Sequence, residues 1–351
     1  MTRTVAILGA GIGEKHLAGY LALGDRFRVS HVCDLDVGLA EKLAATAGAK
    51  AVTDLAEIIA DPAVEIVDIC LPPMLHVPVA LDALAAGKHV IIEKPVAGSL
   101  ADADRLAAAE ANAAGRVFPV FQYRYGRSLE TLSRLEAAGL LGQPQTASLE
   151  THWNRGADYY AVAWRGTWAR ELGGAVLSHA IHSHDLLARA FGPVKSVSAM
   201  LTTRINPIET EDCAAIAFAM QNGALATSSI TLGAADDTSR LRLVYEHVTV
   251  ESGRLPYAPG EDQWTFTARN PDRQTDIDAV ANVAPAKREG FAGYLEAVAD
   301  ALDGKASDAV TLANGVASIE LVTAIYHAHR TGQRVSLPID RSLPICAGLK
   351  P

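Results

Sequence analysis

Three glycines at alternate positions near the start of the chain have a spacing that suits phosphate binding. Gly9, Gly11 and Gly13 follow the apolar run Thr4 to Leu8, and a helical pattern comes directly after them. A main chain without side chains can approach a diphosphate closely, and the start of a helix offers free N–H groups and a positive dipole end. Asp34 lies 25 residues after Gly9, at the end of the next apolar run, where a carboxylate can accept hydrogen bonds from both ribose hydroxyls and repel a 2′-phosphate. The pattern predicts a dinucleotide site and favours NAD over NADP.

The glycine pattern is one residue shorter than the usual GxGxxG. Ile12, which lies between Gly11 and Gly13, is also an expected cofactor contact. Glycines also mark ordinary tight turns, and Asp34 could be a strand-end cap. Asp36 is a second, less favoured ribose ligand. The position between strand and helix, with Asp34 at the expected distance, favours the dinucleotide interpretation.

Apolar runs of strand length alternate with helical patterns over the first third of the chain, which predicts a doubly wound parallel sheet of the Rossmann type. The expected strands are Thr4–Leu8, Phe27–Cys33, Glu65–Cys70, His89–Ile92 and Val117–Phe121, and the expected helices are Glu14–Leu23, Leu39–Ala47, Leu75–Ala86 and Ala101–Ala114.

The rest of the chain alternates apolar and polar residues in several runs, which predicts an α+β domain with a large, mostly antiparallel open sheet. Its expected helix is Leu129–Ala138, and its strands are Gln143–Trp153, Val194–Arg204, Cys213–Met220, Ala224–Leu232, Leu241–Tyr245 and His247–Glu251. We therefore assign residues 1–122 to the first domain and 123–351 to the second. A helix at about 311–330 either stays with the second domain or packs back on the first. Asn270–Lys287 is the best candidate for a long flexible loop.

Composition narrows the class of protein. The chain has 351 residues, 31 Lys plus Arg and 40 Asp plus Glu, a formal charge of −9. At about 150 residues per domain, this length predicts two domains. The acidic balance argues against nucleic acid or an anionic membrane as the main partner. No uninterrupted apolar run reaches about 18 residues, and the start shows no signal-peptide pattern. Four scattered cysteines predict neither a disulfide scaffold nor a zinc site, so a cytoplasmic protein is expected.

Two further stretches make the chain resemble a known family. The segment Cys70–His76 (CLPPMLH) leads into Ala85–Pro95 (AAGKHVIIEKP), and Gly173–Asp185 reads GGAVLSHAIHSHD. These stretches resemble the Gfo/Idh/MocA family of NAD(P)-dependent oxidoreductases, named for glucose–fructose oxidoreductase and inositol dehydrogenase. Apolar helical patterns from Phe291 and from Ala313 also fit the family, so the resemblance covers nearly the whole chain.

The resemblance implies roles for individual residues. Lys94 matches the lysine that faces the nicotinamide and the reacting hydroxyl, and His182 the histidine that exchanges a proton with that hydroxyl. Asp185 matches the acid one helical turn later and is a further candidate for substrate contact. The remaining implied cofactor contacts are Leu71, Pro72, His76 and Glu93. These residue types suit hydride transfer, because a histidine titrates near neutral pH and a lysine is a compact cation for a developing alkoxide.

One position departs from the family. Ser178 stands where many members have Asp or Asn, four residues before the histidine. A hydroxyl can still bind substrate, so Ser178 stays a catalytic candidate, but it brings no negative charge to raise the basicity of His182. His179 is a partial substitute and a substrate candidate. His179, His182, His184 and Asp185 could instead suggest a metal. Ligands on one helix face are three or four residues apart, as the histidines His179 and His182 are, but His184 has this spacing to none of the others, and we expect no metal.

Aromatic and charged residues gather between positions 153 and 170. The stretch holds Trp153, Trp164, Trp168, Arg155, Asp158, Tyr159, Tyr160, Arg165 and Arg170. Tryptophan faces bury the C–H faces of sugar rings, while charged side chains bind hydroxyls. Trp164 and Arg165 are the expected substrate contacts, helped by a similar W-R segment in family members. Arg124 resembles a substrate-side arginine in some members, and a surface ion pair is the alternative.

These features predict an NAD-dependent dehydrogenase that oxidises a secondary CH–OH group of a sugar, a cyclitol or a related polyhydroxy compound. One alternative is redox-assisted elimination or glycoside cleavage through a keto-sugar, with NAD recycled. Another is a non-enzymatic NAD-linked sugar sensor. A homodimer or homotetramer through the second sheet is expected, because the outer face of that sheet often forms the interface in the family.

Overall fold

The computed structural model describes residues 2–351, which divide into two compact units. The first comprises residues up to Phe121 together with Phe291–Ile319, and the second comprises Gln122–Gly290 and Glu320–Pro351. The first break lies one residue from the boundary predicted at 122. The segment 291–319 lies in the first unit, whereas the prediction assigned 123–351 to the second domain and left open only that a helix at about 311–330 packs back on the first.

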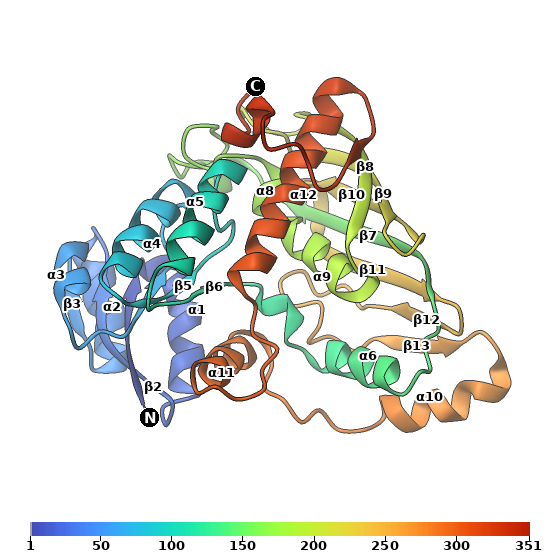
Figure 1. Ribbon diagram of the computed structural model, residues 1–351, viewed down its shortest axis with the longest axis horizontal. Coiled ribbons are helices and arrows are strands. Elements are labelled where there is room, and N and C mark those ends of the chain that lie inside the picture. The colour runs from blue at the N-terminus through green and yellow to red at the C-terminus, as the bar shows by residue number, and fades with distance from the viewer. Residues whose placement is uncertain (1) are drawn as a thin grey trace. The chain divides into compact units, whose positions relative to one another are not determined.

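The first unit is built on a parallel sheet with strand order β3-β2-β1-β4-β5-β6 (Figure 1). Its strands are β1 (Arg3–Leu8), β2 (Phe27–Cys33), β3 (Lys50–Val52), β4 (Ile66–Ile69), β5 (His89–Ile92) and β6 (Val117–Pro119). Its helices are α1 (Ala10–Leu21), α2 (Val37–Ala47), α3 (Leu55–Ala60), α4 (His76–Ala85) and α5 (Leu100–Ala111). The order reverses between β1 and β4, and ligands of such sheets bind beyond the carboxyl ends of the strands at this point. The predicted Rossmann sheet is confirmed, with β3 and α3 as additions.

The segment Phe291–Ile319 belongs to the first unit because its helix α11 (Gly290–Leu302) packs on α1. A Cβ on Gly19 would lie 2.9 Å from Leu295 Cδ1, so the glycine permits close approach of the two helices. The Tyr294 hydroxyl donates to the Phe118 carbonyl oxygen at 2.7 Å. Helix α12 (Leu312–Thr331) then continues from the first unit into the second.

The second unit holds an eight-stranded sheet with order β13-β12-β11-β7-β10-β9-β8-β14 (Figure 1). Its strands are β7 (Pro144–Asn154), β8 (Val194–Thr202), β9 (Cys213–Met220), β10 (Leu225–Thr231), β11 (Gly233–Tyr245), β12 (Val248–Glu251), β13 (Thr265–Ala268) and β14 (Val335–Ser336). Its helices include α6 (Arg127–Ala137), α7 (Ala157–Tyr160), α8 (Ala175–Ser178), α9 (Ile181–Phe191) and α10 (Gln274–Ala281). Only the β7–β10 pair is parallel among the described neighbouring pairs, so the predicted mostly antiparallel sheet is confirmed.

Helix α9 covers one face of this sheet. The Ser183 hydroxyl lies 3.2 Å from the Thr151 hydroxyl on β7, and His184 Nε2 lies 3.1 Å from Ser228 Oγ on β10. The strands alternate buried and exposed residues, as a sheet with one covered face should. Helix α9, which carries His182, is therefore anchored on a rigid platform.

The prediction of a flexible loop over Asn270–Lys287 is wrong. Residues 274–281 form α10, whose Ile277 is buried, and the Asn270 side chain accepts the Asp272 N–H at the start of the preceding turn. The polar composition of this stretch hid one buried apolar anchor.

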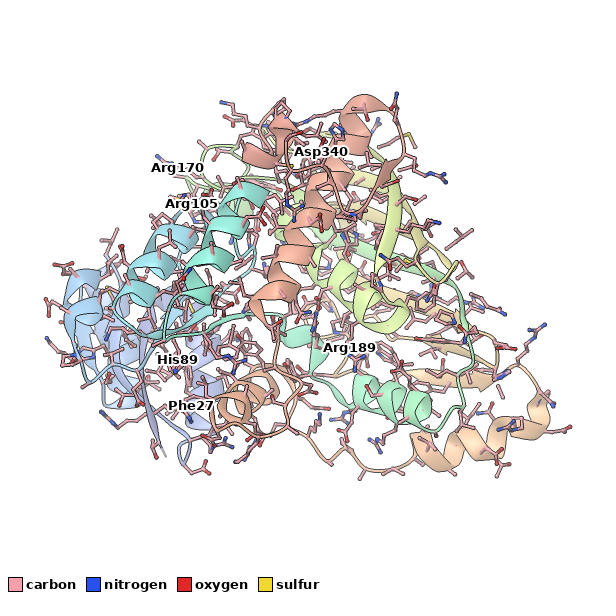
Figure 2. The ribbon with its side chains drawn as sticks, viewed as in Figure 1. Phe27, His89, Arg105, Arg170, Arg189 and Asp340 are labelled. Carbon is pink, nitrogen blue, oxygen red and sulfur yellow. The ribbon has the colours of Figure 1, made fainter. Side chains whose placement is uncertain are left out.

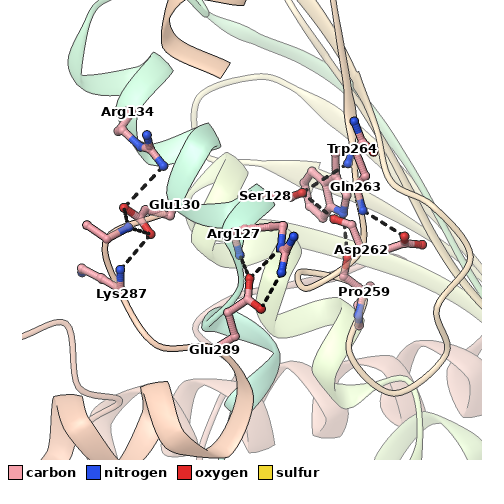
Figure 3. Close-up of polar contacts among 11 residues, drawn as sticks. Arg127, Ser128, Glu130, Arg134, Pro259, Asp262, Gln263, Trp264, Lys287 and Glu289 are labelled. Atoms are coloured by element: carbon pink, nitrogen blue, oxygen red, sulfur yellow. Dashed lines mark hydrogen bonds and ion pairs between the residues drawn. The ribbon is translucent and has the colours of Figure 1, made fainter. Parts of the chain in front are cut away.

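Helix α6 binds the chain that follows α10, through polar contacts (Figure 3). Arg127 pairs with Glu289 at 2.9 Å, and Glu130 accepts the Lys287 N–H at 3.3 Å. The Ser128 hydroxyl donates to the Asp262 carbonyl oxygen at 2.6 Å. The contacts with Glu289 and Lys287 hold this part of the chain on α6. The Ser128 contact holds Asp262, which precedes β13, on the same helix.

Candidate active site

The glycine segment starts a helix four residues earlier than predicted. Helix α1 begins at Ala10, so Gly11 and Ile12 lie in its first turn. Among the described residues, the N-cap Gly9 has no side chain to cap this end, no acidic residue occupies the first turn, and Asp34 accepts only the Ala10 N–H of this turn. A Cβ built on Gly11 would meet nothing within 4 Å in the described structure, and Ile12 is 43% exposed. The helix start therefore presents open N–H groups and space for a phosphate.

The other two glycines are needed for packing. Gly9 has φ +101°, and its Cβ would lie 2.4 Å from the Cys70 carbonyl oxygen. A Cβ on Gly13 would lie 2.7 Å from Ile7 Cγ2, so this glycine lets α1 rest directly on β1. Gly9 thus makes the tight turn, Gly11 leaves an open face, and Gly13 permits a close helix–strand contact. These are the three uses of glycine in a dinucleotide fold.

Asp34 lies next to this helix start. Its Oδ2 accepts the Ala10 N–H at 2.8 Å, and its Oδ1 accepts the Asp36 N–H at 2.9 Å. The Asp36 side chain instead caps α2 through the Gly38 N–H, so it is committed to the helix. Leu35 is 92% exposed beside them, an apolar surface suited to a planar base. These residues fit the adenosine half of NAD.

The predicted nicotinamide-side residues follow β4 and β5. Glu93 is buried, and its Oε2 accepts the Lys94 N–H at 3.0 Å, while Lys94 is half-buried. Both His76 ring nitrogens lie 2.7 Å from carbonyl oxygens, those of Pro95 and Leu71. Burial lowers the pKa of His76, and the two carbonyl oxygens oppose that shift. His76 therefore positions the Leu71 loop, in which Pro72 is also half-buried, and has no ring nitrogen left for the cofactor.

A buried polar cluster beneath these loops was missed from the sequence. His16, Asp68 and Cys70 bring possible ligand atoms within 4.8 Å of one another. The Asp68 oxygens accept hydrogen bonds from the His16 ring and the Tyr20 hydroxyl, and burial raises the pKa of the Cys70 thiol to about 12. The polar side chains of this cluster are hydrogen-bonded to one another, so the cluster is a hydrogen-bonded network. Its signal in the sequence was an aspartate inside an otherwise apolar strand.

In the second unit, two residues of the short helical turn Gln122–Arg124 hold α9. The Tyr123 ring stacks on the His182 ring, with centroids 4.1 Å apart and planes at 17°. Arg124 binds Asp185 through two hydrogen bonds of 2.7 and 2.6 Å. Burial raises the pKa of Asp185, and Arg124 opposes that shift. Arg124 and Asp185, predicted as separate substrate ligands, thus bind each other and fix the helix that carries His182.

His179 lies between α8 and α9 and faces the aromatic segment. Its Nε2 lies 3.1 Å from the Tyr159 hydroxyl, and its ring meets Trp153 edge-on at 5.2 Å. The Arg165 guanidinium lies over the rings of Tyr159, at 3.9 Å, and Trp164, at 4.3 Å, and also donates to the Tyr159 hydroxyl. The predicted substrate residues Trp164, Arg165 and His179 therefore form one group, and Tyr159 joins them.

Other members of the aromatic segment have structural partners. Arg155 pairs with Asp237 at 2.9 Å and donates to the Tyr257 hydroxyl at 2.6 Å. The Trp168 indole N–H donates to the Glu209 carbonyl oxygen at 3.0 Å. Arg170 is exposed (Figure 2). Arg165 is thus the arginine of this segment best placed beside His179.

Ser178 donates from its hydroxyl to Glu171 Oε1 at 3.0 Å. Glu171 is buried and was missed, because a partner seven residues away in an irregular loop leaves no periodic signal. A second buried carboxylate, Glu211, accepts the Val176 N–H at 2.9 Å and the Tyr326 hydroxyl at 2.7 Å. Glu171 and Glu211 therefore hold the turn before His182. The Glu171 carboxylate also lies within hydrogen-bond distance of Ser178, although it is seven residues away in the sequence.

Two of the four residues considered as metal ligands, His184 and Asp185, have other partners. His184 is buried with Nε2 3.1 Å from Ser228 Oγ, and burial lowers its pKa to about 4, so it is a neutral core histidine. Asp185 is bound by Arg124. His184 and Asp185 are structural residues of α9.

A glycine-started helix with Asp34 on a parallel sheet, joined to an α+β unit, defines a dinucleotide-dependent enzyme scaffold. Residues 3–121 match the model of an oxidoreductase family with an NAD-binding Rossmann fold, and residues 129–251 match the GFO/IDH/MocA C-terminal domain. The chain belongs to the Gfo/Idh/MocA family of oxidoreductases, and NAD(H) is the cofactor of its first unit.

Relatives cover different shares of the chain. An uncharacterized oxidoreductase from Synechocystis is 28% identical over 65% of each chain. A 4-carboxy-2-hydroxymuconate-6-semialdehyde dehydrogenase from a Sphingobium species is 30% identical over 65% of this chain and 71% of its own. The WlbA dehydrogenase of Bordetella pertussis, solved with NADH and UDP-GlcNAcA, is 28% identical with a TM-score of 0.85, covering 97% of this chain and 100% of its own. Within residues 2–351, no helix combines the length and apolar character that crossing a bilayer requires.

Proposed function

We propose that the protein is an NAD-dependent dehydrogenase that oxidises a secondary hydroxyl of a sugar, a cyclitol or a related polyhydroxy compound. The observation that carries the proposal is the combination, in one chain, of the open α1 start beside Asp34 with Lys94 and a ring-stacked His182. The WlbA dehydrogenase, which binds NADH and a nucleotide sugar, supports the same class.

In this proposal NAD supplies the hydride acceptor when bound. The Lys94 ammonium donates a hydrogen bond to the substrate oxygen as it becomes an alkoxide, which a cation stabilises. His182 accepts the hydroxyl proton, because a neutral imidazole nitrogen can act as a general base. Tyr123 holds the plane of the His182 ring, and Arg124 with Asp185 holds its helix.

A ligand screen tests the proposal. Sugars, uronic acids and cyclitols are each added to the protein with NAD+, and the melting temperature is measured. A ligand that binds only the folded state raises it. Compounds that do so are then assayed for the near-ultraviolet absorbance of NADH. Free NADH from at least one compound is expected. Product formation in which bound NADH forms only transiently and returns its hydride, with no net NADH, would favour the elimination alternative. Binding without NADH would favour the sensor.

Within this class we favour a substrate that carries an anionic group. Arg165 is half-buried between two aromatic rings, and within the described residues no carboxylate oxygen lies within 4.0 Å of its guanidinium. A guanidinium stays charged, so the uncompensated cation favours a carboxylate or phosphate near it. The nucleotide sugar bound by WlbA supports this choice.

Matched substrates separate charge from shape. Glucose with glucuronate, and other pairs that differ by one carboxylate, are compared in the wild type and in Arg165→Met. The variant should lower kcat/KM for the acid by about 10- to 100-fold, the loss of one charge-assisted hydrogen bond of about 1.5–3 kcal/mol. It should leave the neutral partner little changed. Equal losses for both members would show that Arg165 is structural.

We also propose that two copies associate through the sheet face opposite α9. Met200 is 72% exposed and Leu225 is 60% exposed there, among small residues that allow close approach. Met200→Glu should shift the mass measured by light scattering toward the monomer, and an unchanged mass would refute this surface. A cytoplasmic location is proposed from the four cysteines, all of which are free.

A further inference from the structure

His16 lies between two buried carboxylates in the first unit. Its Nδ1 is 2.9 Å from Asp68 Oδ2, and its Nε2 is 3.1 Å from Glu93 Oε1. His16 and Asp68 are fully buried, and Glu93 is 7% exposed. An ionised carboxylate can only accept hydrogen bonds, so both ring nitrogens must carry a proton to satisfy both neighbours. The geometry therefore requires an imidazolium, unless one of the acids itself keeps a proton.

The surroundings favour the charged ring. Burial lowers the pKa of His16, but Asp68 and Cys70, whose Sγ lies 3.5 Å from Nδ1, outweigh burial through charge and hydrogen bonds and raise the pKa well above its usual value. The Tyr20 hydroxyl also donates to Asp68 Oδ2 at 2.9 Å, so this carboxyl group contacts both Tyr20 and His16. The Phe291 ring lies 4.6 Å from the His16 ring and covers it. One buried cation is thus held by two buried anions, an arrangement in which removing one charge strands another.

The cluster connects three parts of the cofactor site. His16 lies on α1, three residues after Gly13, and Asp68 lies on β4. Glu93 directly follows β5 and uses its two oxygens differently. Oε1 faces His16, and Oε2 accepts the Lys94 N–H at 3.0 Å. The position of Glu93, and with it the main chain at Lys94, is therefore coupled to the charge on His16.

We propose that His16 is a permanently protonated positioning residue that holds Glu93 and so places Lys94. Its side chain is fully buried, so we expect it to act through Glu93 and not by contact with cofactor or substrate. The effect of His16 on turnover rests on the proposed dehydrogenase function, but its protonation does not. The proposed function and the proposed protonation can therefore be refuted by separate experiments.

The first experiment measures the proton directly in the wild-type protein. Histidine labelled with ¹⁵N is incorporated, and the His16 signals are assigned by their loss in His16→Gln. Both ring nitrogens should stay protonated from about pH 6 to about pH 9, across the ordinary pKa of about 6.5. A ring that loses a proton near that value, or that shows one bare nitrogen throughout, would overturn the proposal. This measurement needs no substrate.

The second experiment separates positioning from stability. His16→Gln should lower kcat by about 100-fold, because a shift of about 1 Å in a reacting group costs that much. NAD+ affinity by calorimetry should change by less than about threefold. The double variant His16→Gln with Glu93→Gln removes the cation and one of the two anions, so it should regain part of the lost stability but not kcat. His31→Gln, a half-buried histidine on β2, is the matched control and should retain full kcat. A folded His16→Gln enzyme with full kcat would contradict the positioning role.

Discussion

Glu211 should make the second unit less stable as the pH rises toward neutrality. The side chain is buried, and burial raises its pKa from 4.5 to about 7, against the hydrogen bonds from Tyr326 and Val176. The charge of Glu171 raises it further. Below about pH 4.5 both folded and unfolded chains hold the proton. Between about pH 4.5 and 7 the unfolded chain releases it while the folded chain keeps it, so the free energy of unfolding falls over this range.

The size of the effect follows from the two pKa values. They differ by about 2.5, and each unit is worth about 1.4 kcal/mol, so the penalty above pH 7 is ~3 kcal/mol relative to acid. Glu211→Gln is neutral at every pH and removes this dependence. The exposed Glu41 on α2 gives a matched control in Glu41→Gln.

The assay is urea unfolding followed by tryptophan fluorescence, at several pH values from about 5 to about 8. All four tryptophans lie in the second unit, so the signal reports on the unit that holds Glu211. Between about pH 5 and about pH 8, the wild type and Glu41→Gln should lose about 2.5 kcal/mol more than Glu211→Gln. Parallel stability curves for all three proteins would refute the assigned burial and partners of Glu211.

Three further predictions concern the cofactor site and α9. Gly9→Ala should lower the free energy of unfolding by about 1–3 kcal/mol, because its Cβ would lie 2.4 Å from the Cys70 carbonyl oxygen. Gly11→Ala should leave the free energy of unfolding unchanged but weaken NAD+ binding measured by calorimetry. Asp34→Asn should shift the NADP+ to NAD+ affinity ratio by at least about tenfold toward NADP+, and an unchanged ratio would remove Asp34 from the ribose site. Arg124→Met should cost about 3–5 kcal/mol in the same urea assay by leaving Asp185 buried without its cation, and a loss below about 1 kcal/mol would show that the pair is unimportant.

Periodicity alone was enough to predict the framework of both units. The bounds of β5 and β9 match the predicted runs His89–Ile92 and Cys213–Met220, because buried strands with continuous or alternating apolar residues leave a clear signal. Helix α10 was lost because one buried residue, Ile277, supports a helix in an otherwise polar stretch. The start of α1 was misplaced because glycines that serve a ligand look like a turn.

The residues proposed for the chemical step were easier to find in the sequence than the side chains that hold them. Lys94 and His182 lie in recognisable stretches of sequence. Their supports, Glu93 with His16 and Tyr123 with Arg124, depend on side chains brought together from distant parts of the chain. No spacing rule connects residue 16 with residue 93, so such contacts need coordinates. A polar residue inside an apolar strand, such as Asp68, is the sequence signal that most nearly reveals them.

The central claim is that Lys94 serves the chemical step and not the binding of NAD. The most direct measurement compares Lys94→Ala with the wild type in two assays, NAD+ affinity by calorimetry and the rate of NADH formation with the best substrate of the screen. We predict an affinity within about threefold of the wild type and a kcat reduced by at least about 100-fold, the loss expected when one donor to a developing alkoxide is removed. A variant that still turns over at the wild-type rate would contradict the account.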